Sequence, residues 1–354
     1  MSNSRNLSVI HLVTGLNVGG AERAVLDLSA VQSEKIRLIV VSITNDNKLL
    51  SQFDKAGIEV IFLGVNKSFS SFFKSIFRLY KLIKERNVNI LHCHMFHPII
   101  YAIPIKFIKS NVKVVFTSHS FNIGSVFREY IVGFTKMLRA ADIIFSGQMK
   151  SWIYKKKYTY IIPNGVKLSD YSQVGSKNKK FTFVSVARLD EVKNHKSMVE
   201  AASMLKHRYE FQVLFAGTGE LEGDLKTRIA SYGLENIVKL LGYRSDISFL
   251  MNQCHCFMLT SLWEGLPISI LEAFACGLPV ISTAVGSIPE FFSPEEVVFT
   301  KQTPESIAAC MELVMKNYNT YSEQSSKVRD RIAKDFDIGK IGDEHLSLYN
   351  KLLN

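Results

Sequence analysis

The feature of this chain that most constrains its fold is an alternation of short apolar runs, rich in β-branched residues, with longer stretches of helical pattern. Strands buried on both faces of a sheet have this continuous apolar pattern, and helices between them imply parallel pairing. The polar stretch 172–180 separates two series of runs. They cover residues 8–13, 37–43, 59–63, 90–92, 112–118, 142–146 and 160–162, and then 181–187, 211–216, 238–240, 256–259, 279–282 and 297–299. The pattern predicts an α/β chain of two doubly wound domains, joined near residues 170–180.

Charge is divided unequally between the two halves of the chain. The 354 residues carry 43 Lys+Arg and 32 Asp+Glu, a formal net charge of +11. Residues 1–165 carry 22 basic and 9 acidic side chains, whereas residues 166–354 carry 21 and 23. The excess positive charge therefore belongs to the first half, which indicates that the two halves face different partners. A hydrophobic content of 47% supplies a core for each half and excludes a disordered chain.

The composition also argues against several classes of protein. The apolar run 8–13 is too short for a secretory leader, and no window reaches the roughly 18 uncharged apolar residues of a membrane-spanning helix. Nucleic-acid recognition motifs do not accompany the basic charge. The cysteines are odd in number and mostly lie in apolar runs, as expected of reduced core residues in a cytosolic protein. They are Cys93, Cys254, Cys256, Cys276 and Cys310.

Two short clusters contain metal-ligand residue types but lack the paired spacing of a zinc site. They are His92-Cys93-His94 with His97, and Cys254-His255-Cys256. In a strand, Cys254 and Cys256 would share a face that His255 does not. We therefore expect no metal site.

Basic residues follow the first strand of the second half. Arg188 and Lys193 come directly after the run 181–187. Ligands of doubly wound folds bind beyond the carboxyl ends of the strands, where a guanidinium and an ammonium can hold phosphate oxygens. The alternative is a surface ion pair with Asp190 and Glu191.

Glycines follow the next strand. The run 211–216 leads into Gly217 and Gly219, just before a predicted helix. Glycines at this position allow a phosphate to approach the backbone and the helix N-terminus. The alternative is a tight turn without a ligand, because the third glycine of a dinucleotide fingerprint is absent at the expected offset.

Two carboxylates flank a third helix start. Glu264 precedes the helix, Pro267 suits its first turn, and Glu272 lies about two turns further on. The free amides near residues 266–269 favour an anion. This arrangement suits a ligand that carries both a phosphate and several hydroxyl groups, whereas a helix-dipole role would explain Glu264 but not Glu272.

Together these motifs resemble the retaining glycosyltransferases of family 4. The resemblance rests on Glu-x7-Glu from Glu264 to Glu272, on Arg-Leu-x-x-x-Lys at 188–193 and on Gly-x-Gly-Glu at 217–220. In the first half, Gly-Gly-Ala-Glu-Arg at 19–23 resembles the family's glycine loop, and Ile-Pro-Asn-Gly-Val at 162–166 its interdomain strand. The order and spacing of these motifs agree over nearly the whole chain.

The resemblance implies the GT-B fold, in which two Rossmann-like domains face one another. Residues 1–168 would form an acceptor-side domain, and residues 169–335 a domain that binds the nucleotide sugar. The helix 336–354 would pack back on the first domain.

The resemblance also implies a role for each site residue. Arg188 and Lys193 would hold the diphosphate and stabilise its leaving charge. Glu272 would bind the ribose hydroxyls, and Glu264 the donor sugar, while His119 would lie near the sugar hydroxyls. The expected catalytic residues are His119, Arg188, Lys193 and Glu264. The expected donor-binding residues are Gly19, Gly20, Arg188, Lys193, Gly217, Gly219, Tyr243, Glu264, Gly265, Leu266, Ile268 and Glu272.

Three details qualify the resemblance. Many relatives have Gly-Phe-Gly after the first glutamate, whereas this chain has Gly265-Leu266-Pro267, so one amide is missing. Asp335-Phe336-Asp337 imitates the metal-binding motif of the other large glycosyltransferase fold, but it lies in a C-terminal helical stretch. The family works without a bound metal, and retention implies attack by the acceptor on the face from which the diphosphate leaves.

A basic amphipathic helix is predicted over residues 67–87, with six basic residues and one acidic residue. Its apolar residues recur at spacings of three and four, as in a helix that lies on an anionic membrane. They are Phe69, Phe72, Phe73, Ile76, Phe77, Tyr80 and Ile83. The alternative is an ordinary domain helix whose lysines are solvated.

The sequence thus predicts a cytoplasmic transferase, peripheral on the inner face of the cell membrane. It would move a sugar from a nucleotide-diphosphate donor, such as a UDP-sugar, to a glycan or undecaprenyl-linked acceptor in surface polysaccharide assembly. No cofactor is expected. Two alternatives remain open. A sugar-nucleotide epimerase would not need Glu-x7-Glu, and an NAD-binding Rossmann protein would need a complete glycine fingerprint.

Overall fold

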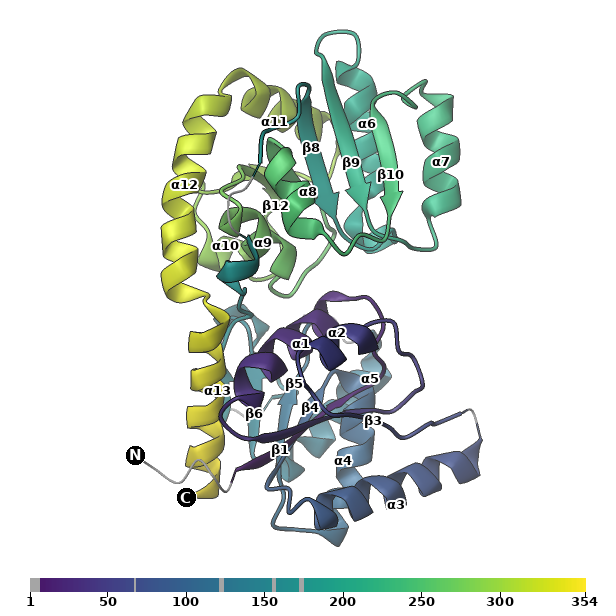
Figure 1. Cartoon of the computed structure of the whole chain (residues 1–354). Helices are drawn as coiled ribbons and strands as arrows, with labels where there is room; N and C mark the ends of the chain where they lie inside the picture. The colour runs from purple at the N-terminus through teal and green to yellow at the C-terminus, as the bar shows by residue number, and fades with distance from the viewer. Residues whose placement is uncertain (1–6, 67, 121–123, 155–156, 172–174) are drawn as a thin grey trace. The chain divides into compact units, whose positions relative to one another are not determined.

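Two parallel sheets contain the strands of the described chain, which comprises residues 7–66, 68–120, 124–154, 157–171 and 175–354 of a computed structural model. Contacts divide the chain into one unit of residues 1–165 with 338–354 and a second unit of residues 166–337. Figure 1 shows a layer of strands between helices in each unit. Each unit is described by itself below.

The sheet of the first unit has seven strands in the order β3-β2-β1-β4-β5-β6-β7. All of its paired strands are parallel, and β1 is buried along its whole length. This burial on both faces is the physical reason for the continuous apolar runs. The strands are β1 (Ser8–Val13), β2 (Arg37–Ser42), β3 (Val60–Phe62), β4 (Ile90–His94), β5 (Lys113–Thr117), β6 (Ala141–Ile144) and β7 (Thr159–Ile161).

The helices of the first unit form two layers. Right-handed crossovers place the helices of connections that run in opposite directions along a sheet on opposite faces. Helix α1 accordingly contacts α2 and α13, whereas α4 contacts α3 and α5. The helices are α1 (Gly20–Ser33), α2 (Leu50–Lys55), α3 (Phe69–Glu85), α4 (Phe96–Ile108), α5 (Val126–Thr135) and α13 (Ile338–Leu353).

The second unit has a sheet of six parallel strands in the order β10-β9-β8-β11-β12-β13. Its strands are β8 (Phe181–Val186), β9 (Phe211–Ala216), β10 (Val238–Gly242), β11 (Cys256–Leu259), β12 (Val280–Thr283) and β13 (Val298–Thr300). Its helices are α6 (His195–Leu205), α7 (Glu222–Ser231), α8 (Ile247–Gln253), α9 (Ile268–Ala275), α10 (Ile288–Phe291), α11 (Pro304–Lys316) and α12 (Tyr318–Asp335).

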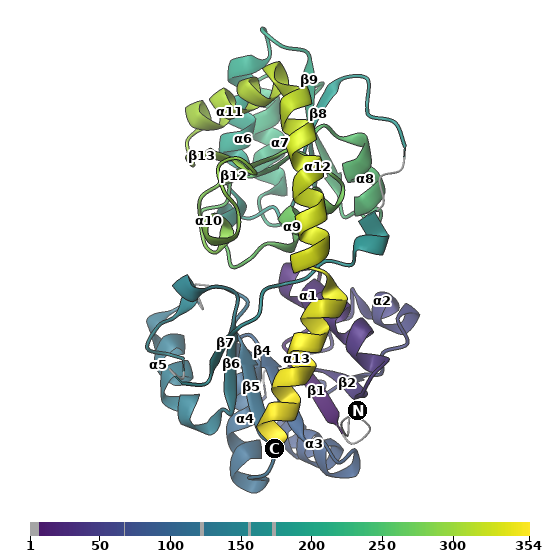
Figure 2. The ribbon, with the colours of Figure 1, turned by 90° about the vertical axis from the view of Figure 1, so that its left-hand side faces the viewer.

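The C-terminal helix α13 belongs to the first unit. It packs against α1, as Figure 2 shows, and Leu346, Leu348 and Tyr349 are part of that unit's hydrophobic core. The predicted fold of two doubly wound parallel α/β units, with the C-terminal helix returning to the first, is confirmed. Among the described residues, no helix is both long and apolar enough to cross a bilayer.

The strand orders locate the sites. In each sheet the order reverses at one point, between β1 and β4 in the first and between β8 and β11 in the second. Ligands of open α/β sheets bind beyond the carboxyl ends of the strands at such a point. The loops that follow these four strands are therefore where each unit should hold a ligand.

Candidate functional site

An ion pair joins the loops that follow β8 and β11. Lys193 Nζ lies 2.6 Å from Glu264 Oε1, and the two side chains are only 17% and 9% exposed. Ser261 Oγ donates to the same carboxylate oxygen at 2.6 Å. If either partner were removed, the other charge would be left unpaired and largely shielded from water, which is costly. Each side chain of this pair therefore holds the other in place.

Local turns position Lys193. The turn Glu191–Lys193 begins at Asp190, whose side chain accepts from the Lys193 backbone N–H. Leu262 N–H donates to Val192 O at 2.7 Å, which fastens the β11 loop to the β8 loop. Arg188 differs from Lys193, because its side chain is 62% exposed and pairs with Asp190 at 3.0 Å. The two predicted cations thus follow the same strand, one exposed and one nearly buried.

Gly217 and Gly219 lie where the β9 loop crosses the β8 loop. A Cβ on Gly217 would come within 1.9 Å of Ala187 O, and one on Gly219 within 2.2 Å of Leu189 O. Gly217 also has a φ of +148°, which L side chains rarely adopt. Packing between the two loops therefore accounts for these glycines, whether or not a phosphate also approaches them. Tyr243 follows β10, next to Gly242, whose carbonyl accepts from Gly217 N–H at 2.8 Å.

Glu272 is buried at 8% exposure in α9 and accepts a short hydrogen bond from the hydroxyl of Tyr171. Tyr171 ends the turn Leu168–Tyr171 and is itself buried. Its hydroxyl fixes the direction of one carboxylate oxygen. Tyr171 lies just before the polar stretch between the two predicted series of strands, and no sequence pattern marked it as a site residue.

The start of α9 differs slightly from the prediction. Pro267 is the residue before the helix and Ile268 is its first residue, so Pro267 does not lie in the first turn. Gly265, Leu266 and Ile268 are buried. The loop after β12 packs against them, because Ser287 N–H donates to Gly265 O at 3.0 Å. The two predicted carboxylates are thus both buried, one just before α9 and one within it.

Gly19 and Gly20 stand at the start of α1, at the end of the loop that follows β1. Gly19 is the N-cap residue, and Arg23 N–H donates to its carbonyl. A Cβ on Gly20 would meet no atom within 4 Å, so the helix start is open there. Fold packing does not require a glycine at position 20, which leaves room for a ligand near the helix N-terminus.

His119 follows β5 in the left-handed backbone region, with a φ of +61°. Burial lowers its pKa to about 3, so the imidazole is neutral at pH 7. His119 Nε2 lies 2.9 Å from His94 Nδ1, and the ring lines a cavity of about 20 Å³, which has room for one water molecule. A non-glycine residue in this region is uncommon, and histidine is one of the residue types that adopt it more often than others.

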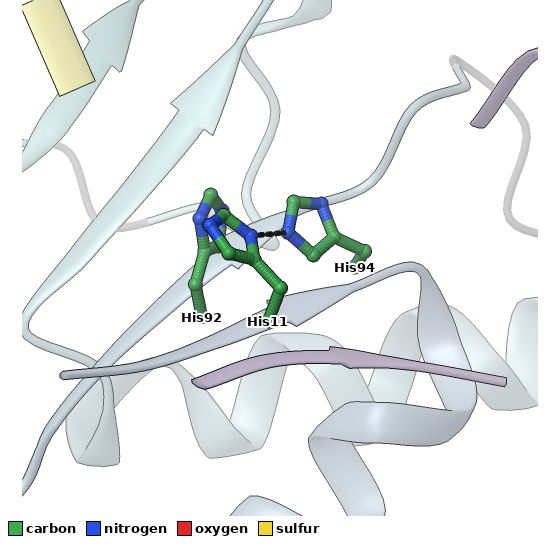
Figure 3. Close-up of side chains that lie close together, drawn as sticks. All are labelled: His11, His92 and His94. Carbon is green, nitrogen blue, oxygen red and sulfur yellow. Dashed lines mark hydrogen bonds between the residues drawn. The ribbon is translucent and has the colours of Figure 1, made fainter. Parts of the chain in front are cut away.

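Behind His119, histidines gather from two neighbouring strands, β1 and β4. The parallel register pairs His11 on β1 with His92 on β4, and His94 lies two residues further on the same face. Figure 3 shows the three imidazoles close together, with a hydrogen bond of 2.6 Å between His11 Nδ1 and His94 Nε2. One ring nitrogen from each lies within 4.8 Å of the others, the spacing of a possible metal site.

The clusters considered in the sequence are arranged differently in the fold. Cys93 is buried, and His97 lies apart from His92 and His94, with its Nδ1 3.4 Å from Thr14 Oγ1. His255 stacks on Phe181 at 4.8 Å, while Cys254 and Cys256 are buried. All five cysteines are free thiols, and burial raises the pKa of each.

Comparison with known proteins identifies the family. The model for glycosyl transferases group 1 matches residues 168–331, and the model for glycosyltransferase family 4 matches residues 18–170. The chain belongs to glycosyltransferase family 4. The family resemblance drawn from Glu-x7-Glu and its neighbouring motifs is therefore confirmed.

Two relatives of this family 4 chain have names that state a reaction or a biosynthetic process. The UDP-Gal:alpha-D-GlcNAc-diphosphoundecaprenol alpha-1,3-galactosyltransferase of Escherichia coli is 32% identical over 235 residues, which cover 59% of this chain and 61% of that protein. The capsular polysaccharide biosynthesis glycosyltransferase CapH of Staphylococcus aureus is 22% identical, over 79% of this chain and 82% of its own. The matches span 61%, 64% and 62% of the first three curated relatives.

A solved structure supports the fold. HepE of Anabaena in complex with UDP-glucose superposes with a TM-score of 0.88 at 18% identity, covering 98% of this chain and 100% of that one. This likeness confirms the GT-B fold class.

Proposed function

We propose that this family 4 chain transfers a sugar from a UDP-sugar to a lipid-linked saccharide acceptor in surface polysaccharide assembly. The observation that carries the proposal is the largely buried Lys193–Glu264 pair at the switch point of the second sheet, with Glu272 buried in the helix that follows. A cation, two carboxylates and a helix start suit a ligand with a diphosphate and many hydroxyl groups.

Each donor group is matched to a residue. Lys193 and Arg188 bind the diphosphate, Glu272 the ribose hydroxyls, and Glu264 the hydroxyls of the sugar. The Glu264 carboxylate also holds the Lys193 ammonium in place before the donor arrives. Tyr171 keeps the Glu272 carboxylate directed, so that it can meet the ribose hydroxyls. The remaining predicted donor contacts are Gly19, Gly20, Gly217, Gly219, Tyr243, Gly265, Leu266 and Ile268.

Transfer proceeds with retention by attack on one face of the sugar. The acceptor oxygen forms a bond to the anomeric carbon, and the bond from that carbon to the phosphate oxygen breaks with its electron pair on that oxygen. The acceptor proton passes to the leaving phosphate. Lys193 and Arg188 stabilise the charge that develops there, which is the largest contribution such residues make to rate. His119 contacts a sugar hydroxyl.

The names of relatives guide the choice of substrates. The Escherichia coli relative is named for UDP-Gal and a diphosphoundecaprenol-linked GlcNAc, and HepE was solved with UDP-glucose. A UDP-hexose and an undecaprenyl diphosphate sugar are therefore the first donor and acceptor to test with this chain.

The test uses matched pairs of variants. Lys193→Ala should lower kcat by about a thousandfold, in line with loss of one preorganised charge at the reacting phosphate. Lys196→Ala removes a lysine three residues away that pairs with Glu191 and should leave kcat unchanged. Glu272→Ala should abolish transfer, whereas the exposed Glu305→Ala should not. Turnover at the wild-type rate in Lys193→Ala and Glu272→Ala would refute the proposal.

We propose that the first unit binds to the surface of an anionic membrane through the layer formed by α3, α4 and α5. Residues 1–65 carry six basic and six acidic side chains, whereas residues 66–165 carry sixteen and three. The excess charge of the first half thus lies wholly in the segment that builds this layer. Anionic lipid headgroups attract such a surface.

Exposed aromatic side chains accompany this charge. The apolar face predicted for α3 is divided, because Ile76, Leu79 and Ile83 are buried whereas Phe69, Phe73 and Phe77 are 80%, 55% and 66% exposed. Packing of α3 onto the rest of the domain requires only the buried residues, and does not explain the exposed phenylalanines. Further exposed apolar residues in this segment are Phe107, Ile108, Val126, Phe127, Tyr130, Phe134, Met137 and Trp152. Aromatic rings beside lysines are typical of surfaces that enter the headgroup region.

Vesicle sedimentation tests the membrane contact. Replacing Lys74, Lys81 and Lys84 with serine should weaken binding to vesicles of phosphatidylglycerol and phosphatidylcholine about a hundredfold, from about 1 kcal/mol per lysine. A control triple variant at Lys226, Lys316 and Lys327, which are 64%, 59% and 76% exposed in the second unit, should bind as wild type does. Equal binding by both variants would refute the membrane contact without affecting the donor site.

A further inference from the structure

A chain of hydrogen bonds runs from His119 through the core of the first unit. His119 Nε2 lies 2.9 Å from His94 Nδ1, His94 Nε2 lies 2.6 Å from His11 Nδ1, and His11 Nε2 lies 2.9 Å from Gln32 Oε1. His11, His94 and Gln32 are at most 2% exposed. His92 forms a separate branch, bonded to Tyr349 and Thr117.

These contacts favour hydrogen bonding over a shared metal ion. Both ring nitrogens of His11, His92 and His94 already have partners within 3 Å. The rings of His92 and His94 have centroids only 4.0 Å apart and are tilted by 34°, so they lie largely face to face. Lone pairs in the planes of such rings do not converge on one point, as the ligands of an ion must.

The hydrogen bonds from His119 to Gln32 all run in one direction, which is set by the ring nitrogen of each histidine that carries the proton. A carboxamide oxygen can only accept, so His11 must carry its proton on Nε2. Burial lowers the pKa of His11 to about 4, and burial also lowers that of His94, so each ring is neutral and has one proton. His11 Nδ1 therefore accepts from His94 Nε2–H, and His94 Nδ1 accepts from His119 Nε2–H. His119 is left with an unprotonated Nδ1.

This unprotonated Nδ1 remains available as a hydrogen-bond acceptor. His119 Nδ1 is buried and has no hydrogen-bond partner among the described residues, and His119 lines the small cavity. An unprotonated nitrogen accepts a hydrogen bond, whereas the opposite tautomer would donate one. The tautomer of His119 thus decides which polarity of ligand group it can bind.

We propose that Gln32, His11 and His94 are positioning residues that set the tautomer of His119, so that its Nδ1 accepts a hydrogen bond from a hydroxyl group of the sugar substrate. The inference rests on the proposed function for the identity of that hydroxyl. Gln32 acts on His119 across two intervening imidazoles. This series of hydrogen bonds does not carry a proton away from His119, because it ends at the Gln32 carboxamide, which does not take up a proton.

The experiment measures the protonated nitrogen of His119 by two-bond ¹H–¹⁵N NMR on the full chain with ¹⁵N-labelled histidine. The His119 signals are assigned by their loss in His119→Gln. Wild type should show a proton on Nε2. Gln32→Glu keeps an acceptor and should show the same tautomer, whereas Gln32→Met keeps the volume, removes the acceptor and should produce a mixture of tautomers. His207→Gln, at an exposed position, is the control.

Kinetics supply a second readout. Gln32→Met should raise the KM for the donor about tenfold, equivalent to one weakened hydrogen bond, and Gln32→Glu should restore it. A wild-type proton on Nδ1, or a Gln32→Met spectrum identical to wild type, would overturn the inference. A chain that binds no nucleotide sugar would overturn the proposed function instead, because the NMR measurement is made on the free protein.

Discussion

Acid should unfold the first unit because its core holds neutral histidines. Burial lowers the pKa of His11 and His345 to about 4 and that of His119 to about 3, and it lowers those of His92 and His94 as well. An unfolded chain binds a proton on each histidine below about pH 6.5, whereas the folded unit excludes these protons. The free energy of unfolding should therefore fall as the pH drops from 6.5 towards 4.

The three printed values give the magnitude. A histidine whose pKa falls from 6.5 to about 4 on folding loses about 2 kcal/mol of stabilisation between pH 8 and pH 5. His11, His119 and His345 together amount to about 6 kcal/mol, and His92 and His94 act in the same direction. Because a whole domain is stable by only about 5–15 kcal/mol, the first unit should be close to unfolding at pH 5.

Urea unfolding followed by tryptophan fluorescence can report on the unfolding of this unit separately from that of the second unit. The chain has two tryptophans, and Trp263→Phe leaves Trp152 in the first unit as the reporter. His345→Gln should remove about 2 kcal/mol of the difference between pH 8 and pH 5, whereas His207→Gln, at an exposed position, should remove none. Equal free energies of unfolding at pH 8 and pH 5 would show that these rings are not buried and neutral.

Two further predictions concern the second unit. Gly217→Ala should destabilise it by about 2–4 kcal/mol in urea titrations, because a Cβ would lie 1.9 Å from Ala187 O at a positive φ. Gly223→Ala in α7, where a Cβ meets no atom within 4 Å, should stabilise it by up to about 1 kcal/mol, and equal effects would refute the packing argument. Tyr171→Phe should weaken UDP binding about tenfold by calorimetry, since Glu272 loses its hydroxyl partner, and unchanged affinity would remove Tyr171 from the site.

The fold could be predicted because burial on both faces leaves a direct trace in sequence. Each predicted apolar run coincides with a strand, and the restart after residue 180 coincides with β8. The positions of three predicted site residues in the fold could be anticipated for a related reason. Parallel strands bring their carboxyl ends to one edge, so Arg188, Lys193 and Glu264, which follow strand ends, all lie at that edge, where Lys193 and Glu264 pair.

Contacts between residues far apart in the sequence could not be predicted from any sequence pattern. Tyr171 meets Glu272 across 101 positions, and Gln32 meets His11 from a helix that sequence cannot orient. Sequence signals for the histidine chain existed in His11, which interrupts the apolar run of β1, and in the His92-Cys93-His94 cluster, but neither pattern predicted that the rings meet. For α3, periodicity predicted the apolar residues but not their division into a buried row and an exposed row, because that depends on which neighbour covers the helix.

Binding of a nucleotide sugar by the second unit is proposed to depend on Lys193, Glu264 and Glu272. A thermal-shift screen of nucleotide sugars and NAD tests it most directly, because a ligand at a hundred times its Kd adds about 2.7 kcal/mol to the stability of the folded state. We expect a rise in Tm with a UDP-sugar that is lost in Lys193→Ala and kept in Lys196→Ala. A rise with NAD alone, or an equal rise in Lys193→Ala, would contradict it.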